Sequence, residues 1–456
     1  MRKKILEKAA SAPASFVEAG FEKLKNVEQE LVSKEPLKAA EEYWHTLGPG
    51  LTTGASDDDP SGIATYSQAG AKYGFGLSWL ALFTFPLMAV VQEMCGRIGL
   101  VTGRGLAANI RLHFSRKVLY ACGVLLFIAN VFNIGADLGA MAKGAQLLAP
   151  SLNFYLVIVL FALISLLLQI FTTYARYARY LKYLALVLLA YMFSAFSVHM
   201  DWGALFRATI VPTIAFTKDQ ILLICAILGT TISPYLFFWQ TSQEVEEEIL
   251  RGEKTLAVRR SSVTPREIKD MRTDVWSGMF ISNLVMFFII AACAATIFSH
   301  GLGGIQTAAD AALALKPFAG NFAFWLFAVG IIGTGFLAIP VLAGSASYAL
   351  SETFGWKQGL YRTLGQAKAF YGVIIIAMVL GILLNLTHID PIKALIYSAV
   401  FNGLVAPLVL VLIVRMAGSK TIMGENVSGP LATSVGWLTV ALMTFSGLAA
   451  IVSLFI

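Results

Sequence analysis

The sequence predicts an all-α integral membrane protein with about eleven membrane-spanning helices. Of its 456 residues, 57% are hydrophobic and only 13% are charged, whereas a soluble domain carries roughly 25% charged residues. Apolar runs of about 20 residues recur along the whole chain, and each is long enough to cross a bilayer core of roughly 30 Å. The basic residues gather in alternate connecting loops, as expected for a chain that crosses a membrane repeatedly.

The expected spans are separated by short polar or charged connections, and their boundaries are uncertain by several residues. They cover residues 46–72, 76–100, 118–148, 153–173, 180–199, 218–243, 275–299, 320–350, 369–387, 393–415 and 432–455.

Charge in the loops gives the expected orientation. The most basic loop lies between the sixth and seventh spans and contains Arg251, Lys254, Arg259, Arg260, Arg266, Lys269 and Arg272. The positive-inside rule therefore places the N-terminus on the cytoplasmic side of a plasma membrane. We expect this membrane to be a bacterial inner membrane. The net charge of +7 then reflects topology, and we expect the lipid bilayer rather than nucleic acid as a partner.

Residues 1–45 precede the first span and are rich in charge. Their apolar residues recur at loosely helical spacing, which predicts a cytoplasmic amphipathic segment lying on the membrane surface. A simple anchor is favoured over a regulatory element. The remaining residues, 46–456, are expected to form one transmembrane domain.

The first span contains an acidic interruption, Asp57-Asp58-Asp59-Pro60-Ser61-Gly62. Pro60 removes a backbone donor and clashes with the preceding turn, and it favours an extended backbone at Asp59. This frees carbonyl groups around Ser56 to point at a ligand. Three carboxyl groups near the membrane midplane are costly unless they face a cavity, a cation or protons, so the break is predicted to be a functional site.

The sixth span is interrupted in the same way, by Gly229-Thr230-Thr231-Ile232-Ser233-Pro234-Tyr235. Interrupted helices at matching positions of two five-helix halves are typical of inverted-repeat transporters with a midplane site. We expect a first repeat over about 46–199, a second over about 218–415 and an extra helix over about 432–455. Two proline kinks without a ligand are the alternative, but a kink alone does not need three aspartates.

These motifs resemble the Nramp divalent-metal transporters over roughly residues 46–455, and the resemblance implies the leucine-transporter fold. Asp59-Pro60 stands where that family has Asp-Pro-Gly-Asn, and the Gly229 to Tyr235 stretch stands where it has Gly-Ala-Thr-Val-Met-Pro-His-Asn. The other matching motifs are Gly48-Pro49-Gly50, Gln68-Ala69-Gly70, Arg97-Ile98-Gly99-Leu100-Val101-Thr102-Gly103 and Ala136-Asp137-Leu138-Gly139.

Several positions depart from the pattern that this resemblance implies. Asp59 matches the metal-binding Asp, but Gly62 occupies the place of the ligand Asn and Ser233 that of the ligand Met. Tyr235 replaces the His associated with proton movement. In the third span Asp137 is kept, whereas Ala140 replaces a Glu. Iron-type selectivity and ordinary proton coupling are therefore not expected.

The substitutions favour hard cations. Loss of a thioether and addition of carboxylates move a site toward oxygen ligands, which suit Mg²⁺, Ca²⁺ and Mn²⁺. The resemblance includes Nramp-related magnesium transporters that lack the same Met and proton residues. The leading hypothesis is a transporter of Mg²⁺ or Mn²⁺ that works by alternating access. Asp59 would be the central ligand, assisted by Asp58, Ser233 and the carbonyls near Ser56 and Thr230.

A different solute on the same scaffold is the alternative hypothesis. The N-termini of half-helices at Pro60 and Pro234 carry partial positive charge, so they could hold a small anion such as bicarbonate or a carboxylate. In that case Asp57, Asp58 and Asp59 would serve a coupling Na⁺ or H⁺. Ser345 and Ser347 in the eighth span could complete a sodium site.

Further polar residues have two interpretations each. Asp137 could carry protons or pair with Lys143. Asn130, Asn133 and Asn402 could line the pathway, although interhelical hydrogen bonding is the favoured interpretation. A final acidic group is interpreted as a solvated cytoplasmic end, with an ion vestibule as the alternative: Glu244, Glu246, Glu247 and Glu248.

Enzymatic activity is not expected. The chain lacks a nucleophile elbow, a P-loop and an HExxH motif. The four cysteines lie singly in apolar stretches, without a CxxC pair, and are interpreted as small buried hydrophobes. We expect no cofactor, and the sequence does not indicate an oligomeric state.

Overall fold

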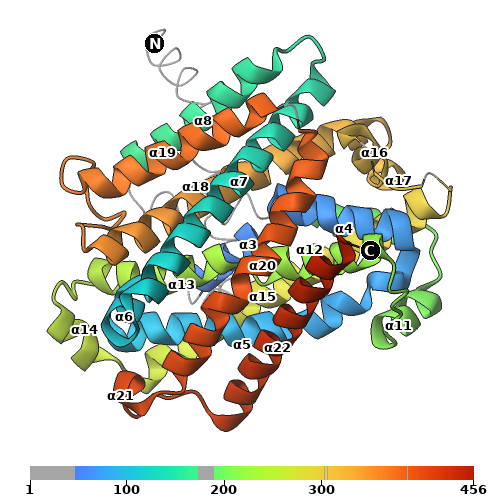
Figure 1. Cartoon of the computed structure of the whole chain (residues 1–456). Coiled ribbons are helices and arrows are strands. Elements are labelled where there is room, and N and C mark those ends of the chain that lie inside the picture. Colours follow the sequence, from blue (N-terminus) through green and yellow to red (C-terminus); the bar gives the residue numbers. More distant parts are fainter. Residues whose placement is uncertain (1–46, 173–188, 302, 306, 388, 456) are drawn as a thin grey trace, which may run out of the picture. The chain divides into compact units, whose positions relative to one another are not determined.

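The computed structural model describes residues 47–172 and 189–455, apart from 302, 306 and 388. Contacts divide the chain into Met1–Gly48 and Pro49–Ile456, and the description below concerns the second unit. All regular structure in the described residues is helical (Figure 1). The expected amphipathic segment over 1–45 lies outside the described residues.

Nine helices among the described residues are long and apolar enough to cross a membrane. They are α5 (Trp79–Thr102), α7 (Arg116–Leu148), α8 (Phe154–Phe171), the pair α12–α13 (Lys218–Leu250), α15 with the turn after it (Pro265–Phe298), α18 (Ala323–Phe354), α19 with the turn after it (Lys368–Thr387), α20 (Pro391–Ala417) and α22 (Pro430–Ser453).

Two of the eleven expected spans are not among these nine helices. The first span is divided into α3 (Pro49–Asp57) and α4 (Pro60–Tyr73), each too short to cross alone. The fifth is represented by α10 (Leu189–Ser197), while the preceding residues 180–188 lie outside the described part. The total of eleven crossings therefore remains a prediction.

The seventh span begins earlier than expected, at Pro265 rather than near residue 275. Thr264 accepts a hydrogen bond from the backbone N–H of Glu267, whose side chain accepts one from the Thr264 N–H. This capping box, with Pro265 at the first helical position, sets the start of α15. The hydropathy pattern missed it because the first two turns of α15 are charged.

The helices form two groups that reflect the inverted repeat. In one group α3 packs against α15, and α13 (Pro234–Leu250) packs against α5. Each contact joins one half of a broken helix to the second helix of the other half of the chain, and α4, which follows the first break, also packs against α15. In the other group α7 packs along α18, and α8 and α19 pack against both (Figure 1). The boundaries of the two repeats remain a prediction.

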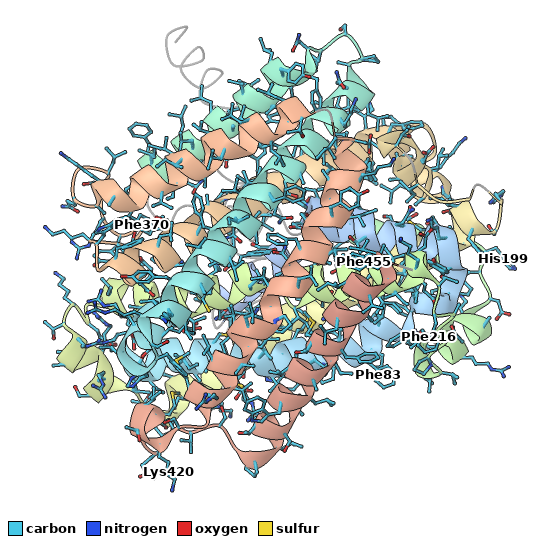
Figure 2. All side chains as sticks on the ribbon, viewed as in Figure 1. Phe83, His199, Phe216, Phe370, Lys420 and Phe455 are labelled. Carbon is cyan, nitrogen blue, oxygen red and sulfur yellow. The ribbon has the colours of Figure 1, made fainter. Side chains whose placement is uncertain are left out.

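The outer faces of these helices are apolar. Large side chains such as Phe83 and Phe455 are 45% and 85% exposed (Figure 2). Exposed apolar surface on this scale is unfavourable in water and matches the requirements of a lipid environment. The membrane-protein prediction is therefore confirmed by the surface as well as by helix length.

Candidate functional site

The break in the first span places three aspartates between two short helices. Asp57 is the last residue of α3, and Asp58 and Asp59 connect it to Pro60, the first residue of α4. Asp59 has an extended backbone, with φ −67° and ψ 173°, as the following proline favours. The side chains of all three are 0% exposed.

Asp59 is held by three donors. Its Oδ1 accepts hydrogen bonds from the Ser61 hydroxyl at 2.6 Å and from the Gly62 N–H at 2.7 Å, so it caps α4. Its Oδ2 accepts one from the Asn133 amide at 2.8 Å. An ionised carboxylate has about four lone-pair positions, so Asp59 keeps capacity for one further ligand.

Asp57 and Asp58 have fewer partners. Oδ2 of Asp57 accepts a hydrogen bond from the Ser282 hydroxyl of α15 at 2.7 Å. Its Oδ1 and both carboxylate oxygens of Asp58 have no hydrogen-bond partner among the described residues. Buried carboxylate oxygens without donors are costly unless a cation or a proton compensates them.

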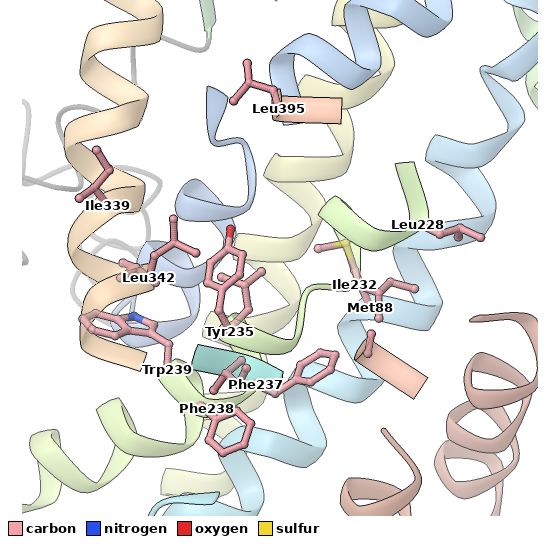
Figure 3. Close-up of a cluster of buried hydrophobic side chains, with 14 of the residues drawn as sticks. Met88, Leu228, Ile232, Tyr235, Phe237, Phe238, Trp239, Ile339, Leu342 and Leu395 are labelled. Carbon is pink, nitrogen blue, oxygen red and sulfur yellow. The ribbon is translucent and has the colours of Figure 1, made fainter. Parts of the chain in front are cut away.

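The second break lies between α12 (Lys218–Thr231) and α13, at Ile232 and Ser233. The Ser233 hydroxyl donates to the carbonyls of Gly229 and Thr230, at 2.7 and 2.6 Å, and does not cap α13. Figure 3 shows Ile232 beside the unwound segment, with Tyr235, Phe237 and Trp239 where α13 begins.

Three contacts join the two breaks. The hydroxyls of Ser61 and Thr230 lie 3.3 Å apart, and those of Tyr66 and Thr231 lie 3.1 Å apart. The Tyr235 hydroxyl donates to the Ser56 carbonyl at 2.9 Å. The Ser56 carbonyl, which was predicted to face a ligand, is thus hydrogen-bonded to Tyr235, the residue at the His position of the Nramp pattern.

Gly62 lies in the narrow space between the two breaks. A Cβ at this position would lie 3.1 Å from the Asp57 carbonyl oxygen and 3.4 Å from Thr230 Oγ1. Only a residue without a side chain fits here unless these neighbours shift. The structure brings together Ser56, Asp57, Asp59, Gly62 and Thr230, and their role in binding remains a prediction.

Asp137 and Asn402 are buried polar residues outside the breaks. Asp137 lies on α7, one helical turn after Asn133, and neither of its carboxylate oxygens has a hydrogen-bond partner in the described residues. Lys143, its suggested partner, lies instead over the Phe154 ring at 5.1 Å. Both amide atoms of Asn402 on α20 also lack a described partner.

Ser345 and Ser347 bond within other parts of the fold. Ser345 accepts a hydrogen bond from Asn130 at 2.7 Å and donates to the Leu342 carbonyl. Ser347 donates to the Phe370 carbonyl of α19. These contacts fix α18 against α7 and α19. A sodium-site role for the two serines remains a prediction.

Metal ligation would not rest on carboxylates alone. Among the described residues, no three His, Cys, Asp or Glu side chains are grouped closely enough to hold a metal ion. The groups around Asp59 are hydroxyl and amide groups with one backbone N–H. A cation here would be bound by fewer than three carboxylates, together with neutral oxygens.

A neighbouring pocket is apolar. It is lined by Ile63 and Ala64 of α4, Ala140 of α7 and Leu395 of α20, with residues of α16 (Ala308–Leu313) and α18. Ala140 is the position where the Nramp pattern has a Glu. The pocket therefore supplies no polar ligand from these side chains.

The N-terminal end of α3 is hydrogen-bonded to α15. Asp274 accepts hydrogen bonds from the backbone N–H groups of Gly50 at 2.6 Å and Leu51 at 3.0 Å, which satisfies two donors of the first turn. An added Cβ at Gly54 would lie 2.3 Å from the Gly278 carbonyl oxygen. The close contact between α3 and α15 sets the position of Asp57.

The acidic end of α13 is not solvated, contrary to the prediction. Glu244, Glu246 and Glu248 are buried, at 6%, 1% and 1% exposure. Glu246 accepts hydrogen bonds from the Tyr348 hydroxyl and from the backbone N–H groups of Leu360 and Tyr361, at 2.8 and 3.0 Å for the two amides. Glu246 is buried because it binds the segment between α18 and α19, whereas Glu244 accepts a hydrogen bond from Gln240 and Glu248 lies 3.8 Å from Arg259.

Replacing Glu246 with alanine is expected to release this segment. Three hydrogen bonds to one carboxylate are lost, and such charged bonds contribute about 1.5–3 kcal/mol each. We expect trypsin to cleave after Lys357 and Arg362 several times faster than in the wild type. The exposed Glu425 provides the control as Glu425→Ala. Equal cleavage rates in the two variants would show that Glu246 does not hold the segment.

The broken helices, the inverted repeat and the buried polar site define a membrane transporter of the leucine-transporter fold. The sequence profile of the Nramp family, described as Natural resistance-associated macrophage protein-like, matches residues 50–453. The chain belongs to the Nramp family.

Similar proteins agree with this assignment. The chain is 25% identical over 401 residues to the divalent metal cation transporter MntH of Pectobacterium carotovorum, covering 87% of this chain and 91% of that one. It is 25% identical to MntH of Caldanaerobacter subterraneus, with 88% and 91% covered.

Solved structures share the fold. The Eremococcus coleocola manganese transporter in complex with an aromatic bis-isothiourea substituted compound gives a TM-score of 0.66 at 17% identity, covering 88% of this chain and 85% of that one. Mhp1, a nucleobase-cation-symport-1 family transporter in a closed conformation, gives 0.57 at 15% identity, with 89% and 91% covered. These likenesses confirm the predicted fold.

Proposed function

We propose that this protein is a secondary transporter of divalent cations that prefers hard cations, Mg²⁺ and Mn²⁺, and works by alternating access. One observation carries the proposal. The buried Asp59 carboxylate lies between α3 and α4, near the oxygen-bearing side chains of Ser61 on α4, Asn133 on α7 and Thr230 on α12. Hard cations favour such oxygen ligands. The curated MntH relatives, described as divalent metal cation transporters, support the substrate class.

The predicted ligands and the predicted coupling acids have separate roles in the proposal. Asp59 is the central ligand, and Asp58 offers two oxygens without described donors. Ser233 and the carbonyls near Ser56 and Thr230 complete the site with water. Asp57 and Asp137 are the candidate acids for a coupling ion, since both are buried and have oxygens without described partners.

Flux measurement tests the proposal. The purified protein in liposomes that contain a dye for Mn²⁺ or Mg²⁺ is expected to take up both ions faster than empty liposomes do. Uptake of Mn²⁺ should be reduced by excess Mg²⁺, because oxygen ligands discriminate weakly between the two. Absence of flux above empty liposomes for both ions would refute the proposal.

A small anion is the second candidate. It is favoured by one observation: α13 begins without a side-chain cap, which leaves the positive end of its dipole available. The substrate would be bicarbonate or a carboxylate, moved with Na⁺ or H⁺. Three buried aspartates beside this helix end oppose an anion, so we rank this second. Uptake of labelled bicarbonate that needs Na⁺ but no divalent metal would favour it.

A further inference from the structure

Asn133 brings a third part of the fold to the site. It lies on α7, outside both broken helices, and its side chain is 0% exposed. Its Nδ2 donates to Oδ2 of Asp59 at 2.8 Å, and its Oδ1 accepts from the Ser398 hydroxyl of α20 at 2.6 Å. One amide therefore connects the Asp59 carboxylate to α20.

The Asn133 amide presents its donor group to Asp59. A carboxylate attracts an N–H donor, so Asn133 presents Nδ2 to Asp59. A divalent cation at Oδ2 would repel that N–H and attract the carbonyl oxygen. Rotation of the amide about its Cβ–Cγ bond exchanges the two groups, because they are nearly the same size.

Ser398 makes this rotation possible without loss of a hydrogen bond. Its hydroxyl lies 2.6 Å from Asn133 Oδ1 and 2.8 Å from the Leu395 carbonyl oxygen, but it has one proton to donate. When Nδ2 turns toward Ser398, the hydroxyl can accept from it and donate to Leu395. The hydrogen bond between Asn133 and Ser398 is therefore kept in both orientations, with its direction reversed.

We propose that Asn133 is a ligand of the transported divalent cation, supplying its amide oxygen by rotation, and that Ser398 is the positioning residue that permits this rotation. The inference rests on the proposed function and adds a specific ligand from α7. It also gives α7 a direct contact with the cation and α20 an indirect one, through the hydrogen bond between Ser398 and Asn133.

Asn130 shows what a purely structural asparagine of α7 does. It lies one turn before Asn133, is also buried, and donates to the Leu342 carbonyl at 2.8 Å and to Ser345 at 2.7 Å, both on α18. Its Nδ2 donates to neither Asp59 nor Ser398, and its Oδ1 has no hydrogen-bond partner among the described residues. Asn130→Ala is therefore a matched control for loss of a buried amide.

Binding and uptake of Mn²⁺ by five variants test the proposal: Asn133→Ala, Asn133→Asp, Ser398→Ala, Asn133→Asp/Ser398→Ala and Asn130→Ala. Affinity is measured by calorimetry on the purified full chain, and uptake in liposomes gives KM and maximal rate. We expect Asn133→Ala to weaken Mn²⁺ affinity by about 10–100-fold, as for partners of metal ligands in general, and Asn130→Ala to change it less than about twofold.

The Asn133→Asp variant distinguishes a residue that binds the cation from one that only donates a hydrogen bond to Asp59. Aspartate keeps an oxygen but cannot donate to Asp59, so affinity stays near wild type if Asn133 binds the cation and falls as in Asn133→Ala if it only orients Asp59. Ser398→Ala should raise KM by about 10-fold. The double variant should bind as Asn133→Asp does, since both aspartate oxygens are equivalent and no rotation is needed.

The outcomes distinguish the two proposals. Wild-type protein that neither binds nor moves Mn²⁺ or Mg²⁺ overturns the proposed function and this inference with it. If wild type transports and Asn133→Asp loses affinity as Asn133→Ala does, or Asn133→Ala matches Asn130→Ala, only the inference is overturned. Melting curves of each variant identify misfolding, and Asn133→Asp, which preserves side-chain shape, keeps the test decisive if Asn133→Ala fails to fold.

Discussion

Asp59→Asn is expected to lower Mn²⁺ and Mg²⁺ uptake by more than roughly 100-fold, because even residues that only support a metal ligand contribute 10–100-fold. The fold should survive. An asparagine Oδ1 can still accept from Ser61 and the Gly62 N–H, which lie 2.6 and 2.7 Å from the Asp59 oxygen. The effect therefore reports the lost charge. Initial uptake rates in liposomes at equal protein content measure it.

The chain offers a close control for this substitution. Asp390 also precedes a proline and caps a helix, accepting from the N–H groups of Ile392 and Lys393 at 3.0 and 3.2 Å, but it is exposed at the start of α20. Asp390→Asn should transport like the wild type. An equal loss in both variants, or an Asp59→Asn rate within twofold of wild type, would remove Asp59 from the site.

Gly54→Val is expected to cause the largest loss of stability, about 3 kcal/mol or more, as overpacking of a close contact does. An ideal Cβ at Gly54 would lie 2.3 Å from the oxygen and 2.4 Å from the carbon of the Gly278 carbonyl. Since this obstacle is backbone, α3 must move away from α15. That movement separates Asp57 from Ser282, so uptake should be lost together with thermal stability in detergent.

Gly372→Val controls for valine in a helix. Gly372 lies within α19, and an added Cβ there would meet no atom within 4 Å. Valine is a better helix former than glycine by a few tenths of a kcal/mol, so this variant should melt at or slightly above the wild-type temperature. If Gly54→Val melts with it and transports normally, close approach of α3 to α15 is not required.

Most of the fold could be predicted because each membrane helix can be identified from its own stretch of sequence. Apolar length identifies the spans, and Pro60 and Pro234 identify the two breaks through their effect on adjacent backbone. The start of α15 was missed although Thr264, Pro265 and Glu267 form a recognisable capping sequence. Hydropathy alone cannot detect a helix that continues beyond the apolar layer.

The site was only partly predictable, for a different reason. The residues of the two breaks can be recognised from the prolines and glycines next to them in the sequence. Asn133, by contrast, contacts Asp59 from another helix, 74 positions away. No local pattern distinguishes it from Asn130, which bonds to α18 instead. The burial of Glu246 was missed likewise, because its partners Leu360 and Tyr361 lie in a distant loop.

The complete burial of Asp57, Asp58 and Asp59 has a kinetic consequence. An ion held there meets neither aqueous phase, so it cannot drift through as ions do in an open pore. Each passage must wait for a helix to move, and such collective motions take microseconds to milliseconds. The protein would therefore move ions singly, at a rate that saturates with concentration, and would not show the steady current of a channel.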